Sequence, residues 1–300
     1  MRKIIIIGGG AAGMFAAISA ADEHTEVHIY EHNEKLGKKL FITGKGRCNI
    51  TNGCDDVEEL LAHVVTNARF LYSAFYTFSN QDMMQFLSDQ GLKLKTERGQ
   101  RVFPVSDKSS DVIRTLERVL KDRGVYIHLR QEVKELLVEN CEICGIRLSD
   151  GQKVNADAVI IATGGMSYPS TGSTGDGYRM AEAAGHHVTK RVPSLVPMTV
   201  ADEWCPELQG LSLKNITFTM KCGKKNFYQE FGEMMFTHFG ITGPVVLSGS
   251  THFAPYLKKG TVTAEIDLKP SLTDEQLDAR LLRDFEKNIN KQIRNSLSEL

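Results

Sequence analysis

The sequence predicts a mixed α/β fold in two parts, and three observations lead to this prediction. The chain opens with an apolar run, a glycine-rich turn and a small-residue helix, which is the pattern of a β-α-β unit. A second apolar run ends in Thr163-Gly164-Gly165. Near residue 192 the chain changes to prolines and alternating apolar runs, as in a β-rich domain. A chain of 300 residues is also long enough for two hydrophobic cores.

The bulk composition is that of an ordinary globular protein, with 41% hydrophobic and 24% charged residues. The formal net charge of −1 lacks the basic excess of a typical nucleic-acid binder, so we expect no nucleic-acid partner. No run reaches the roughly 18 apolar residues of a membrane span, and the first residues do not form a secretory signal. We therefore expect a cytoplasmic protein with reduced cysteines and no membrane partner. The sequence does not indicate an oligomeric state.

The first predicted unit is a strand at residues 3–7, a turn, a helix that reaches residue 22 and a strand at residues 25–30. The turn carries Gly8-x-Gly10-x-x-Gly13. Gly8 permits a tight turn, Gly10 lets the backbone approach a pyrophosphate, and Gly13 allows the helix to pack closely on the strand. The helix N-terminus, with Ala11 and Ala12, offers amides to the phosphates.

Glu31 ends the second strand, 18 residues after Gly13 by subtraction of the two residue numbers. A carboxylate there accepts hydrogen bonds from ribose hydroxyls and repels a 2′-phosphate. The pattern predicts a Rossmann-type dinucleotide site. The alternative is a glycine-rich turn without a ligand.

Further elements follow in order along the rest of the chain. We expect helices in residues 56–90, 111–123 and 177–184, a strand at 125–129, a hairpin-like pair at 134–138 and 143–148, and a buried strand at 158–162. We place the domains at residues 1–192 and 193–300, the second being β-rich to residue 270 and helical from 271. Thr273 and Gln276 form a capping box that opens the last helix. Its apolar stripe consists of Leu277, Leu281, Phe285, Ile289, Ile293 and Leu297.

The run that ends in Ala162-Thr163-Gly164-Gly165, after a hairpin, resembles the flavoproteins that carry two dinucleotide folds. This resemblance favours FAD over NAD as the bound dinucleotide. It implies that Thr163, Gly164 and Gly165 pack against the FAD phosphates and adenosine. It also implies that Val133 contacts the adenine through its backbone.

Two runs after Glu31 make the resemblance more specific: Gly37-Lys-Lys-Leu40 and Thr43-Gly-Lys-Gly-Arg-Cys-Asn-Ile-Thr-Asn52. Three later runs match in order: Arg101-Val-Phe-Pro104, Thr171-Gly-Ser-Thr-Gly-Asp-Gly177 and Phe236-Thr-His-Phe-Gly-Ile-Thr-Gly-Pro244. Together they resemble the aminoacetone-oxidase-like FAD-binding flavoproteins of the BaiN/YhiN type. The resemblance implies a Rossmann-type FAD-binding domain with an inserted β-rich plus helical domain. It also implies that the C-terminal part of the family, which closes over the flavin, is missing from this chain.

The residues of the two runs after Glu31 suit a flavin. Lys39 and Arg47 can neutralise a pyrophosphate, and the backbones of Gly44 and Gly46 can reach flavin carbonyls. Asn49 can donate a hydrogen bond to the ring, and Cys48 lies beside it in the sequence. The alternative is a polar surface loop with solvent-facing basic residues.

Cys48 and Cys54 stand near the place where disulfide reductases carry a redox pair, but the spacing and the neighbours differ, so we expect two unpaired thiols. Cys141-x-x-Cys144 has no second pair to complete a zinc site, and we expect no metal. His238 is a candidate proton donor or acceptor above the flavin; the alternative is a turn histidine. No other residue is a candidate catalytic acid or base.

The resemblance implies an FAD-dependent oxidoreductase that transfers hydride between flavin and a small organic substrate or NAD(P)H. Two alternatives remain open at this point. One is a truncated flavin-binding fragment without catalysis. The other is a flavoprotein that modifies RNA, as some relatives of this superfamily do.

Overall fold

The computed structural model describes residues 1–290 and 292. The chain divides into two compact units, Met1–Thr189 and a second one that begins at Lys190. The division lies three residues before the boundary expected at 192. We describe each unit separately.

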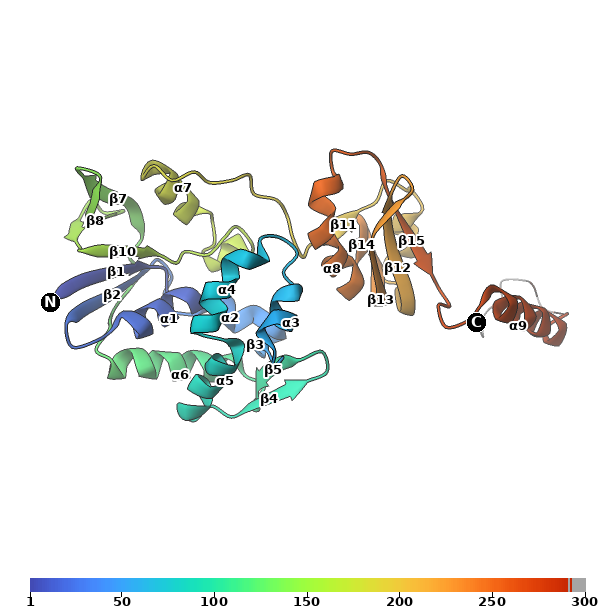
Figure 1. Ribbon diagram of the computed structural model, residues 1–300, viewed down its shortest axis with the longest axis horizontal. Helices are drawn as coiled ribbons and strands as arrows, with labels where there is room; N and C mark the ends of the chain where they lie inside the picture. The colour runs from blue at the N-terminus through green and yellow to red at the C-terminus, as the bar shows by residue number, and fades with distance from the viewer. Residues whose placement is uncertain (291, 293–300) are drawn as a thin grey trace. The chain divides into compact units, whose positions relative to one another are not determined.

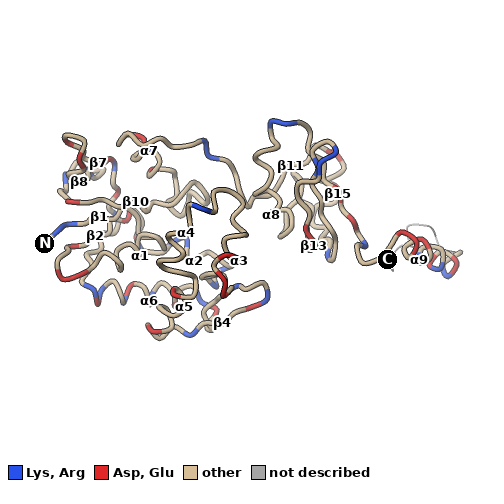
Figure 2. Tube along the Cα trace, viewed as in Figure 1, with Lys and Arg blue, Asp and Glu red and all other residues tan. Residues whose placement is uncertain are grey.

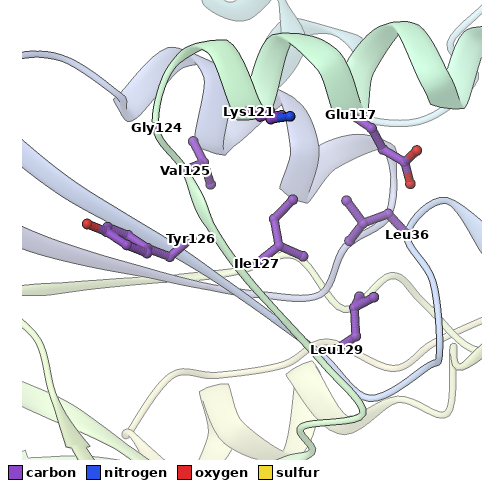
Figure 3. A pocket seen from close by; sticks show the side chains of 8 residues that line it. All are labelled: Leu36, Glu117, Lys121, Gly124, Val125, Tyr126, Ile127 and Leu129. Atoms are coloured by element: carbon purple, nitrogen blue, oxygen red, sulfur yellow. The ribbon is translucent and has the colours of Figure 1, made fainter.

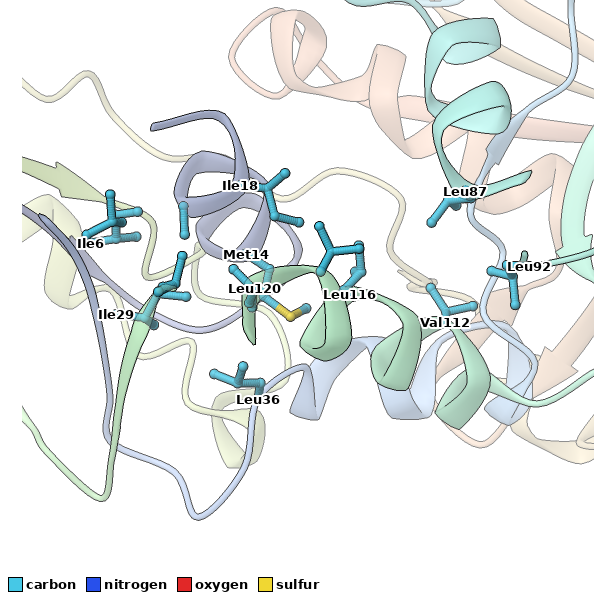
Figure 4. Close-up of a cluster of buried hydrophobic side chains, with 14 of the residues drawn as sticks. Ile6, Met14, Ile18, Ile29, Leu36, Leu87, Leu92, Val112, Leu116 and Leu120 are labelled. Carbon is cyan, nitrogen blue, oxygen red and sulfur yellow. The ribbon is translucent and has the colours of Figure 1, made fainter. Parts of the chain in front are cut away.

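A four-stranded parallel sheet of order β10-β1-β2-β6 forms the centre of the first unit (Figure 1). Its strands are β1 (Arg2–Ile7), β2 (Thr25–Glu31), β6 (Tyr126–Leu129) and β10 (Ala158–Ile161). The helices α1 (Ala11–Ala20) and α6 (Ser109–Asp122) cover one face. Figure 4 shows the apolar core there, with Ile6 and Ile29 of the sheet beside Met14 of α1 and Leu116 and Leu120 of α6. These five side chains are at most 2% exposed, so the sheet and both helices share one dry core.

The opposite face of the sheet packs against a three-stranded antiparallel sheet of β7 (Val133–Glu139), β8 (Glu142–Leu148) and β9 (Lys153–Asn155). Ile5 and Ile7 of β1 meet Tyr30, Ile146 and Met180 in this second core. Met180 belongs to α7 (Asp176–Ala183). Alternate residues of β1 therefore serve two cores, which is why its four isoleucines form an unbroken run.

The remaining elements of the first unit lie between β2 and α6 or after β10. They include a small antiparallel sheet of order β3-β5-β4. The elements are α2 (Lys38–Ile42), η1 (Thr43–Gly46), β3 (Thr51–Asn52), α3 (Val57–Ala62), α4 (Ala68–Thr77), α5 (Asn80–Asp89), β4 (Leu94–Glu97), β5 (Arg101–Pro104) and η2 (Pro169–Thr171). The region expected to be mostly helical, 56–90, is therefore three short helices. A capping box of Ser79 and Asp82 starts the last of them.

The second unit is built on a five-stranded antiparallel sheet of order β11-β14-β13-β12-β15. Phe218, Met220, Met234, Phe236 and Val246 form its core, each at most 4% exposed. Its elements are β11 (Met198–Thr199), η3 (Cys205–Leu208), β12 (Ser212–Cys222), β13 (Lys225–Thr237), β14 (Gly240–Thr242), α8 (Pro244–Phe253), η4 (Ala254–Tyr256), β15 (Val262–Asp267) and α9 (Asp274–Lys287). The mixed α/β fold class, with a parallel sheet and further antiparallel sheets, is confirmed.

Two further elements, β10 and α8, differ from the sequence prediction. β10 is not a buried strand: it lies at the edge of the sheet, where Ile160 and Ile161 are 38% and 36% exposed. The helix α8 was not predicted, because Val245, Val246 and Gly249 disfavour a helix on their own. Tertiary packing forms it, since all three residues are buried.

The last helix begins as predicted at the capping box of Thr273 and Gln276. It ends at Lys287, earlier than the apolar stripe suggested. Asn288 is 6% exposed, and its side-chain amide donates to the Asp284 carbonyl at 2.9 Å, which closes the last turn. Ile289 then lies beyond the helix and is 80% exposed. Ile293 and Leu297 of the stripe lie outside the described residues.

Candidate functional site

Two glycines of the N-terminal turn are required by the packing of the chain itself. Gly8 has a φ of +107°, and a Cβ there would lie 2.6 Å from the carbonyl oxygen of Ala162. A Cβ on Gly13 would lie 1.8 Å from the carbonyl oxygen of Gly8. Any larger residue at either position would force the strand, the turn and the helix apart. Gly8 and Gly13 therefore take the structural roles predicted for them.

Gly10 is different, because nothing in the protein occupies the space beside it. Its backbone is extended, with φ −80° and ψ −170°, which any residue can adopt. A Cβ there would meet no atom within 4 Å. No protein contact requires a glycine here. The open space therefore lets the pyrophosphate of a ligand approach the backbone of the turn.

The N-terminus of α1 opens onto the same space. The amide of Met14 donates to the Gly10 carbonyl at 2.9 Å, and the amides of Ala11 and Ala12 have no partner within the helix. Gly10 provides no side-chain cap, and the first turn holds no acidic residue. Such a helix end favours a phosphate group.

Glu31 lies at the end of β2 and is 8% exposed. Its carboxylate accepts three hydrogen bonds: from the Gly9 amide at 2.6 Å, from the Asn33 amide at 2.8 Å and from the Asn33 side chain at 2.7 Å. These bonds fix the carboxylate beside the glycine turn. The acid predicted to meet the ribose and the turn predicted to meet the phosphates are therefore one connected structure.

A cavity of about 620 Å³ joins these groups, a size typical of small-molecule sites. All its lining residues belong to the first unit. Of the predicted cofactor residues it brings together Gly8, Gly10, Ala11, Ala12, Glu31, Lys39, Val133, Thr163 and Gly164. Gly13 lies behind the turn, and Gly165 is not part of the lining. The residues present fit a dinucleotide, because open backbone, a helix N-terminus and a fixed carboxylate face one space.

Lys39 provides a cation in the cavity. Its Nζ donates to the Ser167 carbonyl at 2.7 Å and to Ser173 Oγ at 2.6 Å. Partial burial lowers the pKa of Lys39 from its usual value. Gly164 has a φ of +77°, and a Cβ there would lie 2.7 Å from Ser173 Oγ. The Thr-Gly-Gly turn and the run around Ser173 thus lie against each other in the lining of the cavity.

Most of the loop predicted to face the flavin, Gly44 to Asn49, lies outside the lining of this cavity. Thr43 lines the cavity, but Gly44, Gly46, Arg47, Cys48 and Asn49 do not. Arg47 donates to Glu97 and to Asp107 and lies over the Phe103 ring at 4.1 Å. The hydrogen bonds that Arg47 donates to Glu97 and Asp107 raise its pKa. Its charge is already balanced by two carboxylates, and its contact with pyrophosphate stays a prediction.

Cys48 and Cys54 are both buried, and none of the six cysteines forms a disulfide. Cys48 is 1% exposed in the first apolar core, and burial raises the pKa of its thiol. A raised pKa disfavours the thiolate that redox chemistry needs. In residues 1–290 no group of three or more His, Cys, Asp or Glu side chains is placed to hold a metal ion.

His238 lies on the exposed turn between β13 and β14, where its ring meets the edge of Phe239 at 4.9 Å. Because it belongs to the second unit, its role above the flavin stays a prediction. Sequence reasoning missed Asn33 and Ser173, which hold Glu31 and Lys39. The signal for Asn33 was its place two residues after Glu31, and Ser173 lies within a run already noted for its resemblance.

A second cavity of the first unit, about 550 Å³, lies beside α6 and β6 (Figure 3). Leu36, Val125, Ile127 and Leu129 form most of its wall, with Glu117 and Lys121 at the α6 side. It has no glycine-rich turn at the start of a helix, so it does not resemble a nucleotide site. Among the described residues no helix is both long and apolar enough to pass through a bilayer.

Comparison of the sequence with known proteins identifies the family to which the chain belongs. The family model described as HI0933-like protein Rossmann domain matches residues 2–264. The 3-dehydro-bile acid delta(4,6)-reductase of Clostridium scindens is 33% identical over 282 residues, which cover 92% of this chain and 67% of that protein. The ribosomal RNA dihydrouridine synthase of Haemophilus influenzae is 34% identical over 277 residues, covering 91% of this chain and 65% of that protein. The chain thus spans about two thirds of the length of these relatives.

Solved structures of low sequence identity share the fold. The 3-ketosteroid-delta4-(5alpha)-dehydrogenase of Rhodococcus jostii has a TM-score of 0.52 at 16% identity, over 62% of this chain and 55% of that one. A flavocytochrome c3 fumarate reductase has a TM-score of 0.51 at 19% identity, over 71% and 47%. Both likenesses concern the fold alone.

Proposed function

Since the chain belongs to the HI0933-like family of Rossmann-domain flavoproteins, the family predicted from its sequence runs, we propose that it is an FAD-dependent oxidoreductase acting on a small organic substrate. One observation carries the proposal. The open space at Gly10, the uncapped N-terminus of α1 and the fixed Glu31 carboxylate face the same cavity. FAD, when bound, supplies the hydride chemistry.

The residues of the cavity divide the binding between them. The α1 amides and the Gly10 backbone would hold the pyrophosphate, and Lys39 adds a positive charge to the lining of the same cavity. Glu31 would accept hydrogen bonds from the ribose hydroxyls and exclude a 2′-phosphate. Val133, 7% exposed and part of the lining, would offer its backbone to the adenine.

The absorption spectrum of the purified chain tests this proposal. We expect a yellow protein whose flavin bands bleach when NADH or NADPH is added without oxygen, NAD(P)H being the proposed reductant. A protein that takes up FAD but stays yellow with both nicotinamides would be a flavin-binding fragment without catalysis. A protein that takes up no FAD would contradict the proposal.

The first substrate to test is a 3-dehydro-bile acid with conjugated double bonds, because the Clostridium scindens relative is named for this reaction. Reoxidation of the reduced flavin by the bile acid, followed at the flavin band, would identify it. If only oxygen reoxidises the flavin, another small acceptor must be sought.

A second candidate function is reduction of uridine in RNA. The relatives named ribosomal RNA dihydrouridine synthase, 34% identical in Haemophilus influenzae and 29% in Escherichia coli, favour it. Reduction of a uracil double bond is also hydride chemistry. Mass spectrometry of unmodified ribosomal RNA, incubated with the protein and NADPH, tests it by the mass of dihydrouridine. The expectation of no nucleic-acid partner stays a prediction until then.

A further inference from the structure

A group of lysines and aromatic rings lies at one end of the second unit, and none of these residues lines the dinucleotide cavity of the first unit. Two segments meet there, the turn between β12 and β13 and the chain from η4 to β15. Cys222 pairs with Lys225 across the turn and with Val262 of β15, so the segments adjoin. Figure 2 shows blue lysine positions on both segments at this end of the unit. We call it the lysine–tyrosine surface, made of Lys224, Lys225, Tyr256, Lys258 and Lys259.

Tyr256 joins the two segments. Its ring lies parallel to Phe227, with 3.9 Å between centroids and 14° between planes. Phe227 packs on the core of the second unit, so the tyrosine ring is held in place. The Nζ atoms of Lys225 and Lys259 lie 5.8 and 4.9 Å from the centre of the ring. Cations from both segments therefore share one aromatic ring.

The four lysines are exposed and carry unbalanced charge. In the part of the chain that the structure describes, none of them is ion-paired, whereas the nearby Lys221 pairs with Glu265. Four unpaired ammonium groups on two adjoining segments create a local positive potential. The net charge of −1 conceals it, because acidic residues elsewhere in the chain cancel the total.

We propose that the lysine–tyrosine surface binds single-stranded RNA. This inference rests on the second candidate function, which needs RNA to be held by the protein. Ammonium groups on two exposed segments suit successive phosphates of an extended chain, and an anchored ring suits an unstacked base. Lysine side chains are flexible, so they can turn to phosphates and leave the ring face to a base.

Binding of a labelled 12-nucleotide oligouridylate to the full chain, followed by fluorescence anisotropy, tests the surface. The variant changes the four lysines together: Lys224→Gln, Lys225→Gln, Lys258→Gln and Lys259→Gln. Each phosphate contact on a single strand contributes about 0.7 to the salt slope, so four contribute about 2.8. Between about 50 and 200 mM salt the unmodified chain should lose about 50-fold more affinity than the variant.

A matched control removes the same charge elsewhere. It replaces four exposed lysines of the first unit by glutamine: Lys93, Lys108, Lys121 and Lys153. The control should keep RNA affinity within about twofold, because non-contacting charges act only through weak long-range potential. Tyr256→Ala should weaken binding by about tenfold, and Tyr256→Phe should preserve it, since stacking needs the ring and not the hydroxyl. FAD content should be equal in all variants.

Three results would overturn the inference. The first is an oligouridylate affinity of the four-lysine variant equal to that of the unmodified chain. The second is a control variant that loses as much RNA affinity as the four-lysine variant. The third is binding of phosphatidylserine vesicles through the lysines, as tight as that of RNA and unaffected by Tyr256→Ala. Lysine-dependent RNA binding without dihydrouridine formation would support the surface and contradict only the second function. A chain that takes up no FAD but binds RNA through these lysines would likewise support it, while contradicting the flavin proposal.

Discussion

The glycine turn at Gly8–Gly13 and the loop at Gly44–Asn49 are both glycine-rich and were both predicted to meet FAD, yet they are constructed differently. In the turn, packing requires Gly8 and Gly13 but does not require Gly10, which lies next to an open helix end. In the loop, Arg47 forms ion pairs with two carboxylates, and Cys48 lies in the apolar core. The comparison teaches that the backbone groups of a phosphate site can come from one short segment, whereas a side-chain site depends on partners far along the chain.

We expect the largest effects from substitutions of Gly10 and Gly13, which should differ in whether they impair FAD binding or fold stability. Gly13→Ala should destabilise the fold by about 2–3 kcal/mol, because its methyl group would enter the Gly8 carbonyl. Gly10→Val should change the free energy of unfolding by less than about 0.5 kcal/mol. It should nevertheless remove FAD retention in gel filtration, because its side chain fills the open space. A Gly10→Val protein with full flavin content would show that the phosphates do not approach this turn.

Glu31→Ala should have the next largest effect. It leaves the buried Gly9 amide without its partner and removes the ribose acceptor, so FAD affinity should fall by about 1–3 kcal/mol. Titration of the apoprotein with FAD measures this. Glu34→Ala, an exposed carboxylate of the same segment, is the control and should leave affinity unchanged. Equal affinity in both variants would rule out the ribose contact.

We expect the stability of the fold to depend on pH through His128, which lies behind the cavity lining. His128 stacks on Tyr30, a lining residue, at 4.4 Å, and its Nε2 lies 2.9 Å from His28 Nδ1. Burial, with smaller contributions from His28 and Lys3, lowers the pKa of His128. The unfolded chain then binds more protons, so stability should fall as pH drops from about 6.5 to the lowered folded pKa.

Urea midpoints at pH values on both sides of that window measure the effect. His128→Phe should flatten the dependence, and His187→Phe, at an exposed position, should preserve it. A dependence of opposite sign would mean that the folded protein favours the charged imidazole.

A substitution in the loop should lower FAD affinity less than a substitution at the glycine turn or at Glu31. Arg47→Gln should lower the melting temperature slightly and less so in high salt, because it breaks a partly exposed ion-pair group. Its FAD affinity should fall less than that of Glu31→Ala. A larger fall would show that Arg47 leaves its carboxylates to meet the pyrophosphate.

The smallest effect is expected from the thiols. Cys48→Ser together with Cys54→Ser should leave flavin reduction intact, because burial keeps Cys48 protonated. A thiolate–flavin charge-transfer band in the reduced protein, absent from the double variant, would instead identify a redox pair.

The same contrast explains what the sequence could predict. Glycine spacing, the strand–helix–strand pattern and Glu31 are local signals, and each was readable. The partners of Arg47 were not, because Asp107 and Glu97 lie 60 and 50 residues away. The helix α8 was missed for a related reason, since residues with weak helix propensity form it through contacts with β13, such as Gly249 beneath Tyr228. The exposure of β10 depends on its edge position in the sheet, which no pattern in 158–162 reveals.

The hydrogen bond from Gly9 to Glu31 has a consequence for spectroscopy. It is 2.6 Å long, joins the ends of two neighbouring strands and is buried. The Gly9 amide proton can therefore exchange with deuterium only when the turn separates from the carboxylate. One resonance thus reports how often the turn separates from Glu31, and slower exchange on titration with FAD would give an occupancy scale that needs no flavin colour.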